Sequence, residues 1–253
     1  MCSTFNRTVV VRGIEILRAF RPGSNWLGNG ELAERTGLSP STVSRLTQTL
    51  VLTGMLQYEQ QRRAYCLAPP VLSFAHSMRT GSTVLGIAAP LMRELAERER
   101  INVGLAAPDK DEMVYLESIR YNRRVALRKV VSGQRVPMEL TSLGRAYLST
   151  LAIPKRRLLQ ASFERRSGAN WRAVSLEINA AIRQVRAHGY CAASWQPEVV
   201  ALATPLTTSE GVYVLNVSVS TEEPISRVER LLGPPLIALA SGIRSSLARI
   251  PEP

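Results

Sequence analysis

The sequence is poor in the two side chains that most often bind transition metals. Only two histidines occur in 253 residues, and the three cysteines, Cys2, Cys66 and Cys191, are far apart. An odd number of widely spaced cysteines does not form a disulfide framework, and no Cys-x-x-Cys pair suggests zinc or thiol redox chemistry. With so few ligands, we expect no metal site and no cofactor.

Long apolar runs are also missing. No stretch approaches the roughly 20 apolar residues that cross a bilayer. The N-terminal segment from Met1 to Gly13 lacks the basic start and continuous apolar run of a secretion signal. We therefore expect no membrane partner and a location in the cytoplasm.

Motifs of common enzyme classes do not occur either. The sequence has no Gly-x-Ser-x-Gly elbow, no Gly-x4-Gly-Lys-[Ser/Thr] phosphate loop and no His-Glu-x-x-His motif. His188 and Cys191 are close in sequence, but His188 continues the apolar stripe of a helix (Val174, Ile178, Ala181, Val185). We predict that the chain is not an enzyme, with a small-acid enzyme as the remote alternative.

What the sequence has in excess is positive charge. The net charge is +12 and the isoelectric point is near 10.4. Such an imbalance favours polyanionic partners, nucleic acid first and anionic membrane second, although an arginine-rich proteome would also produce it. The charge is spread along the chain, with +5 in residues 1–80 and +7 in residues 81–253.

The segment 1–72 predicts short helices followed by a β-hairpin. Helices are expected at 9–20, 31–36 and 40–53, and strands at 55–58 and 64–67. Ser39 is a good N-cap, and Pro40 suits the first turn of the third helix.

The segment from Glu31 to Leu46 predicts a helix-turn-helix. Such a motif needs a small residue at the helix crossing, a glycine able to adopt positive φ at the turn, and apolar residues that lock the helices together. Ala33 and Gly37 meet the first two needs. The apolar positions are Leu32, Leu38, Val43 and Leu46.

The opposite face of the third helix suits DNA. At 100° per residue its side chains are polar and include no acid, whereas an ordinary solvated face usually carries Glu and Lys. Arginine binds guanine, glutamine binds adenine, and serine binds either a base or a phosphate. Together with the start of the helix, the predicted DNA-binding residues are Ser39, Ser41, Thr42, Ser44, Arg45 and Gln48. At the hairpin tip, Arg62 and Arg63 would form a wing that touches phosphate or the minor groove, although two arginines in a turn are also common elsewhere.

Beyond residue 72 the pattern mixes helices and strands. A helical stretch from 71 to 100 has a joint near 79–82. Strands are expected at 102–107, 113–119, 125–131, 199–206 and 212–220, and helices at 142–151, 155–163, 171–188 and 226–249. This order predicts an α/β or α+β sensor domain.

Collinear segments across both halves resemble the IclR (isocitrate lyase regulator) family of bacterial transcription factors. In the N-terminal half they are Val11–Phe20, Leu38–Leu46 and Tyr65–Pro69. In the C-terminal half they are Val114-Tyr115, Pro137-Met138, Thr141–Leu148, Gly189-Tyr190, Ala203–Leu206 and Val214–Ser220.

The resemblance implies an α+β fold with a winged helix-turn-helix at 1–72, a linker helix at 73–82 and a GAF-like α/β effector domain at 83–253. It further implies homodimers paired through the DNA-binding domains, assembled into homotetramers in many members. The implied partners are a double-stranded DNA operator and a small carboxylate or aromatic acid. Repressors and activators both belong to the family.

By position, the resemblance places the effector pocket on Val125, Arg128, Val136, Met138, Ser142, Leu143, Ala201, Ser218 and Ser220. Ser218 and Ser220 point to one face of a strand, and Ser142 lies at a helix start that favours anions, so these hydroxyls either hold a carboxylate or merely pack against a helix. Arg128 either pairs with an acid or faces solvent.

Two positions depart from the family pattern. In place of an acidic loop after Gly189-Tyr190, the chain has Cys191–Pro197, where Trp195 either covers a flat ligand or belongs to the core. Leu143 replaces a smaller residue and would narrow the cavity.

The function predicted from sequence is therefore a ligand-responsive regulator that binds a palindromic operator as a dimer. The alternative of another class is an architectural DNA-binding protein without a ligand. That hypothesis explains the positive charge but not the presence of a large second domain at 83–253.

Overall fold

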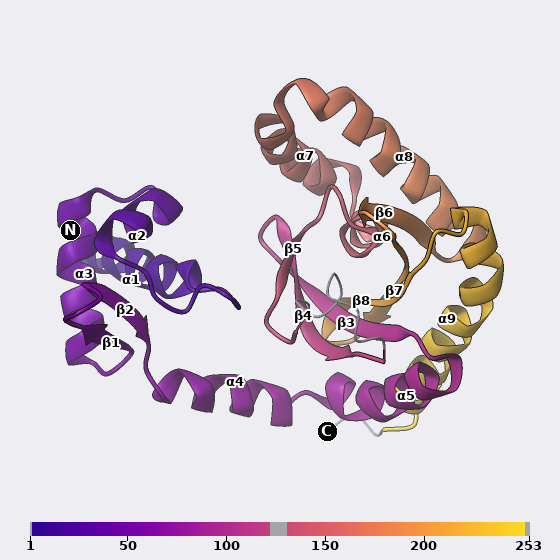
Figure 1. Cartoon of the computed structure of the whole chain (residues 1–253), viewed down its shortest axis with the longest axis horizontal. Helices are drawn as coiled ribbons and strands as arrows, with labels where there is room; N and C mark the ends of the chain where they lie inside the picture. Colours follow the sequence, from indigo (N-terminus) through magenta and orange to yellow (C-terminus); the bar gives the residue numbers. More distant parts are fainter. Residues whose placement is uncertain (1, 122–130, 251–253) are drawn as a thin grey trace. The chain divides into compact units, whose positions relative to one another are not determined.

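The computed structural model describes residues 2–121 and 131–250, with side chains from residue 8 onward. The chain divides into two compact units, residues 1–81 and 82–253 (Figure 1). The three-part division, with a linker helix at 73–82, stays a prediction.

The first unit holds three helices, a hairpin and a fourth helix. They are α1 (Cys2–Ala19), α2 (Asn29–Thr36), α3 (Pro40–Leu52), β1 (Leu56–Glu59), β2 (Ala64–Leu67) and α4 (Pro70–Thr80). Its core is built from α1, α2, α3 and the hairpin, around Ile16, Leu32 and Val43. The two strands are antiparallel, and the backbone of Leu27 pairs with that of Tyr65, which extends the small sheet.

Local sequence explains the turn between α2 and α3. Gly37 ends α2 at φ 68°, a left-handed conformation that glycine adopts at little cost. Ser39 then caps α3 by accepting a hydrogen bond from the Thr42 backbone N–H at 3.4 Å, and Pro40 occupies the first turn. The predicted helix-turn-helix is confirmed.

The second unit begins with α5 (Thr83–Glu99), β3 (Asn102–Asp109), β4 (Glu112–Ile119) and β5 (Arg135–Pro137). Three helices follow, α6 (Ser142–Thr150), α7 (Ile153–Ser167) and α8 (Trp171–His188). The unit ends with β6 (Cys191–Gln196), β7 (Val199–Thr208), β8 (Gly211–Ser220) and α9 (Ile225–Leu247).

The six strands form one antiparallel sheet in the order β5-β4-β3-β8-β7-β6. Because side chains alternate between the faces of a strand, each face has its own core. Leu215 and Val217 of β8 pack with α5 and α9, whereas Val214 packs with α6 and α8. Figure 1 shows α5 and α9 on one side of this sheet and α7 and α8 on the other.

The structure changes the assignment of one segment of the second unit from loop to strand. The segment after Gly189-Tyr190, interpreted from sequence as a loop, is the edge strand β6, because Cys191 to Ala193 pair with Ala203 to Ala201 of β7. The strand expected at 125–131 falls almost wholly outside the described residues.

Within the described ranges, no helix is both long and apolar enough to cross a bilayer. In the same ranges, no group of three or more His, Cys, Asp or Glu side chains is placed to hold a metal ion.

Candidate DNA-reading face and effector cavity

The predicted DNA-reading face is the outer side of α3 (Pro40–Leu52). Val43 and Thr47 are buried against the core, and the Thr47 hydroxyl donates to the Val43 carbonyl at 3.0 Å. That anchoring turns Arg45 and Gln48 outward. Of the residues predicted here, four are exposed (Ser39, Ser41, Arg45, Gln48) and two are half-buried (Thr42, Ser44).

The predicted wing corresponds to the β1–β2 turn. Arg62 and Arg63 are both exposed, and Arg63 adopts a positive φ of 49° that closes the turn. The guanidinium of Arg62 stacks over the Trp26 ring, a contact that the sequence did not predict. Trp26 itself is held beside the wing because the next residue, Leu27, pairs with Tyr65.

The second unit contains a small cavity between the sheet and the start of α6. Its volume is about 30 Å³, enough for two or three water molecules at most. The lining residues are Tyr115, Arg120, Val136, Thr141, Ser142, Leu143, Trp195, Gln196, Val199, Ala201, Asn216 and Ser218.

The N-terminus of α6 forms one wall of this cavity. Thr141 caps the helix by accepting from the Gly144 backbone N–H at 3.2 Å, and Ser142 is the first helical residue. Helix N-termini attract anions because their first N–H groups lack helical partners. Leu143 is also buried and lines the cavity, while its narrowing effect stays a prediction.

Arg120 brings positive charge to the cavity. Its Nε donates to the Ser118 hydroxyl at 3.0 Å, just beyond the end of β4. Burial lowers the pKa of this guanidinium, and the nearby Tyr115 phenol acts in the opposite direction. Arginine nevertheless stays protonated in proteins, so the cavity has a partly desolvated cation.

Tyr115 and Asn216 form the polar floor. Both lie above Gly104, where an added Cβ would come within 3.0 Å of Asn216 Oδ1 and of the Tyr115 ring. Burial raises the pKa of Tyr115, while Arg120 and a hydrogen bond from Asn216 lower it. Asn216 Oδ1 is buried and accepts no hydrogen bond within the described structure, which leaves an acceptor at the floor.

Comparison with known proteins accounts for both units. The family model for the IclR helix-turn-helix domain matches residues 9–60, and the model for the bacterial transcriptional regulator IclR C-terminal domain matches residues 76–241. The chain belongs to the IclR family. It is therefore a transcriptional regulator with a DNA-binding and an effector domain, and the expectation that it is not an enzyme is confirmed by this membership.

Individual IclR-family proteins match along almost the whole chain. The HTH-type transcriptional regulator TsaQ1/TsaQ2 of Comamonas testosteroni is 29% identical over 96% of this chain and 90% of its own length. An IclR-family regulator from Brucella abortus has a crystal structure with a TM-score of 0.85 and 33% identity, covering 95% of this chain and 92% of that one.

A third relative is an IclR homologue from Microbacterium hydrocarbonoxydans, whose crystal structure contains 4-hydroxybenzoate. Its TM-score is 0.72 at 20% identity, covering 96% of this chain and all of that one. At that identity the similarity establishes the shared fold. The matches also confirm the predicted fold class, while the GAF-like label stays a prediction.

The predicted pocket residues divide into three groups. Those lining the cavity are Val136, Ser142, Leu143, Trp195, Ala201 and Ser218. Met138 is instead fully buried in the core under α6, and Ser220 is the last residue of β8, beyond the cavity lining. Val125 and Arg128 lie outside the described residues.

Sequence reasoning missed Arg120, Tyr115 and Asn216. One signal was available: Asn216 is two residues before Ser218 and therefore on the same face of β8. Arg120 follows the end of a strand, where no periodicity indicates the direction of a side chain.

Proposed function

We propose that this IclR-family protein binds a palindromic DNA operator as a homodimer and changes its DNA affinity when a small organic acid occupies the cavity beside α6. The observation that carries the proposal is that the cation Arg120 and the N-terminus of α6 line the same small cavity. A carboxylate would bind both groups at once. A cytoplasmic location, where chromosomal DNA is accessible, completes the proposal.

The remaining polar groups suit a hydroxylated acid. Asn216 Oδ1 accepts from a ligand hydroxyl, and the hydroxyl of the buried Ser218 bonds a second polar group. The 4-hydroxybenzoate complex of the Microbacterium relative supports this class of ligand. A cavity of about 30 Å³ is too small for an aromatic acid, so binding such a ligand requires the cavity to open.

Trp195 is the residue whose movement opens the cavity. It is 38% exposed and lies near the end of β6, where the pairing with β7 is irregular. Its side chain also lines a neighbouring groove of about 500 Å³. Displacement of Trp195 into that groove would join the two spaces and admit a flat ligand.

Effector binding is coupled to DNA binding through a shift in the populations of two conformations of the dimer. An effector that binds one conformation of the dimer better than another changes the spacing of its two α3 helices, and thus the fit to two half-sites. The effector and the DNA then change each other's affinity by the same factor.

The test is a thermal-shift screen of the full chain against small carboxylates, from glyoxylate and pyruvate to hydroxybenzoates. A ligand at 100 times its dissociation constant adds about 2.7 kcal/mol to stability. We expect one class of acid to raise the melting temperature and Arg120→Met to abolish that rise. The matched control is Arg93→Met, an exposed arginine of α5.

The DNA half of the proposal is tested by selection from a randomised duplex library. We expect enriched sequences with two-fold symmetry, whose affinity changes when the identified acid is added. An equal response of Arg120→Met and Arg93→Met would remove Arg120 from the site. Uniform binding to all sequences, with no acid that stabilises the protein, would instead favour an architectural DNA-binding protein.

A further inference from the structure

Half of the net charge of the chain lies on one helical hairpin outside the DNA-binding unit. The α7–α8 hairpin, residues 153–188, holds eight cations and two anions, a net charge of +6 out of +12. By contrast, residues 1–80, which include the helix-turn-helix, have a net charge of +5. The DNA-reading face therefore does not account for the most basic part of the molecule.

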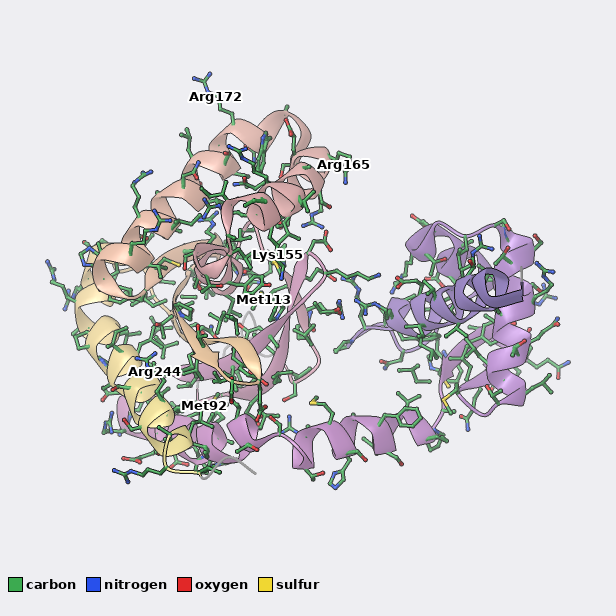
Figure 2. All side chains as sticks on the ribbon, turned by 180° about the vertical axis from the view of Figure 1, so that it is seen from behind. Met92, Met113, Lys155, Arg165, Arg172 and Arg244 are labelled. Atoms are coloured by element: carbon green, nitrogen blue, oxygen red, sulfur yellow. The ribbon has the colours of Figure 1, made fainter. Side chains whose placement is uncertain are left out.

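Two of the eight cations, Arg166 and Arg156, are held by the protein itself, one by ion pairs and the other by partial burial. Arg166 donates to both carboxylate oxygens of Glu139 at 2.8 Å and to Asp111 at 2.6 Å, and Arg156 is half-buried. The other six are exposed and form no ion pair with the described residues. We call them the hairpin cations: Lys155, Arg157, Arg165, Arg172, Arg183 and Arg186. In Figure 2 the side chains of Arg165 and Arg172 extend away from the hairpin.

Helix stability does not explain where several of these cations lie. The N-terminal end of a helix carries a partial positive charge and favours acidic side chains. Lys155 is the third residue of α7, and Arg172 is the second residue of α8. Neither helix has an acid in its first turn. The basic residues at these positions therefore oppose the helix dipole and point to a role in binding.

On α8 the cations form a stripe. At 100° per residue, Arg172, Arg183 and Arg186 fall within about 60° of one another along roughly 21 Å of helix. Asn179, also exposed, lies between them on the same face. The one acid of the helix, Glu177, points elsewhere and pairs with Arg145. The stripe is thus an exposed row of positive charge without a neutralising carboxylate among the described residues.

We infer that the α7–α8 hairpin is a second, sequence-independent contact to the phosphate backbone of duplex DNA. Five of the six hairpin cations are arginines, whose planar guanidinium binds phosphate through two parallel hydrogen bonds. A duplex carries phosphates along its whole length, so it can contact cations at both ends of the stripe, whereas the acids of a protein surface are scattered. In addition, a chain already held on DNA through α3 meets further DNA at high effective concentration.

This contact has a distinct thermodynamic signature, separate from operator recognition and from ligand response. Affinity falls as salt rises, and each phosphate that a cation neutralises makes the plot of log affinity against log salt concentration steeper by about 0.9. The experiment therefore uses a duplex of arbitrary sequence, the full chain and a series of KCl concentrations, with fluorescence anisotropy as the readout. We expect the slope to be less steep by about 2 to 3 in the triple variant R172Q/R183Q/R186Q.

Two variants serve as controls. R93Q/R230Q/R244Q removes the same charge from exposed positions of α5 and α9, and we expect its slope to stay close to that of the wild type. R172K/R183K/R186K keeps the charge and should also keep the slope. All variants should melt at the temperature of the wild type, because the substituted side chains are exposed.

Equal slopes for the two glutamine variants would overturn the inference, because general charge would then explain the binding. An unchanged slope for R172Q/R183Q/R186Q would also overturn it, because the stripe on α8 would then neutralise no phosphate of the duplex. Failure to select a symmetric operator would contradict the proposed function without changing these slopes, so the two failures are distinguishable.

Discussion

The guanidinium carbon of Arg62, at the tip of the β1–β2 hairpin, lies 5.3 Å from the centroid of the Trp26 ring. We therefore expect Trp26 to be a positioning residue for the predicted wing, because the stack restricts Arg62 before DNA binds. Its own position is fixed by two backbone hydrogen bonds between Leu27 and Tyr65, at 3.0 and 2.9 Å.

Replacement of Trp26 by alanine should therefore weaken DNA binding without unfolding the unit. An exposed cation–π contact contributes about 0.5–1 kcal/mol, which corresponds to a loss of affinity of about two- to fivefold. Trp26→Phe should lose less. A double-mutant cycle with Arg62→Ala is the decisive measurement: additive effects would show that Trp26 does not act through Arg62.

Arg45 should determine the base preferred at one position of each half-site. Its side chain is exposed on the acid-free face of α3, one turn before Thr49. Arg45→Ala should cost about 1–3 kcal/mol in operator affinity and relax specificity at that position. Binding to single-base variants of the selected operator measures this. Thr49→Ala, on the same helix, should leave specificity intact, and an Arg45→Ala protein with unchanged selectivity would contradict the role.

Helix α4 should be part of a dimer interface. Val71, Phe74 and Met78 are spaced i, i+3 and i+7 and share one face, yet no residue of α4 is buried in the single chain. Phe74 is 62% exposed and Met78 50% exposed. We expect Phe74→Asp with Met78→Asp to yield a monomer in sedimentation equilibrium and to lose binding to symmetric operators.

The control for this dimer prediction replaces two leucines of the second unit, Leu158 and Leu176, by aspartate. They are 77% and 64% exposed, so the change in polarity is similar. If the control dissociated as readily as the α4 variant, the loss of the dimer would not be specific to substitutions in α4.

The helices of this protein could be predicted closely where amphipathic periodicity and end signals agree. The bounds of α8 follow from the stripe of Val174, Ile178 and Ala181 and from Gly189, which adopts φ 81° at its C-terminal end. The strand β6 could not be predicted, because Cys191, Ala192 and Ala193 are small and show no strong alternation. They become a strand through pairing with β7, a tertiary effect.

The cavity residues also could be predicted only in part, because some of their positions depend on tertiary packing. Resemblance located Ser142 and Ser218, which are distant in sequence and meet only because α6 packs on β8. It could not locate Arg120, since a residue past the end of a strand is directed by the packing around it. Motif spacing likewise predicted two arginines at the wing, but the stack of Arg62 on Trp26 depends on the Leu27–Tyr65 bridge.

Cys191 should be inert toward thiol reagents in the native protein. Burial raises the pKa of its thiol to about 12, an effect that Arg145 only partly offsets. The reactive species is the thiolate, which is therefore negligible at pH 8. We expect mass spectrometry after alkylation at pH 8 to show modified Cys66, which is half-buried, and unmodified Cys191. Both should react in denaturant.

The same shift predicts how stability depends on pH. The pKa of Cys191 is higher in the folded chain than its ordinary value of 9.0, so the neutral thiol favours the folded state. That contribution is complete below about pH 9 and is lost as the pH rises toward 12. Cys191→Ala should therefore unfold with a flatter pH dependence above pH 9; an identical slope would contradict the assignment.

Gly144 should be the position in α6 that tolerates no side chain. An added Cβ would come well within 3.0 Å of the Cα and the carbonyl oxygen of Met138, closer than Cβ atoms approach in proteins. These are backbone atoms of the segment that leads into the helix, so a rotamer change cannot relieve the clash. Gly144→Ala should lower the free energy of unfolding by about 3 kcal/mol or more and displace the wall of the cavity.

Gly86 provides the matched control, because it is an exposed glycine inside α5 with no atom within 4 Å of an added Cβ. There the alanine variant should stabilise the helix by about 0.5–1 kcal/mol. Urea unfolding monitored by circular dichroism compares the two variants directly. If Gly144→Ala were as stable as Gly86→Ala and still responded to the acid, close contact between α6 and Met138 would not be what shapes the effector site.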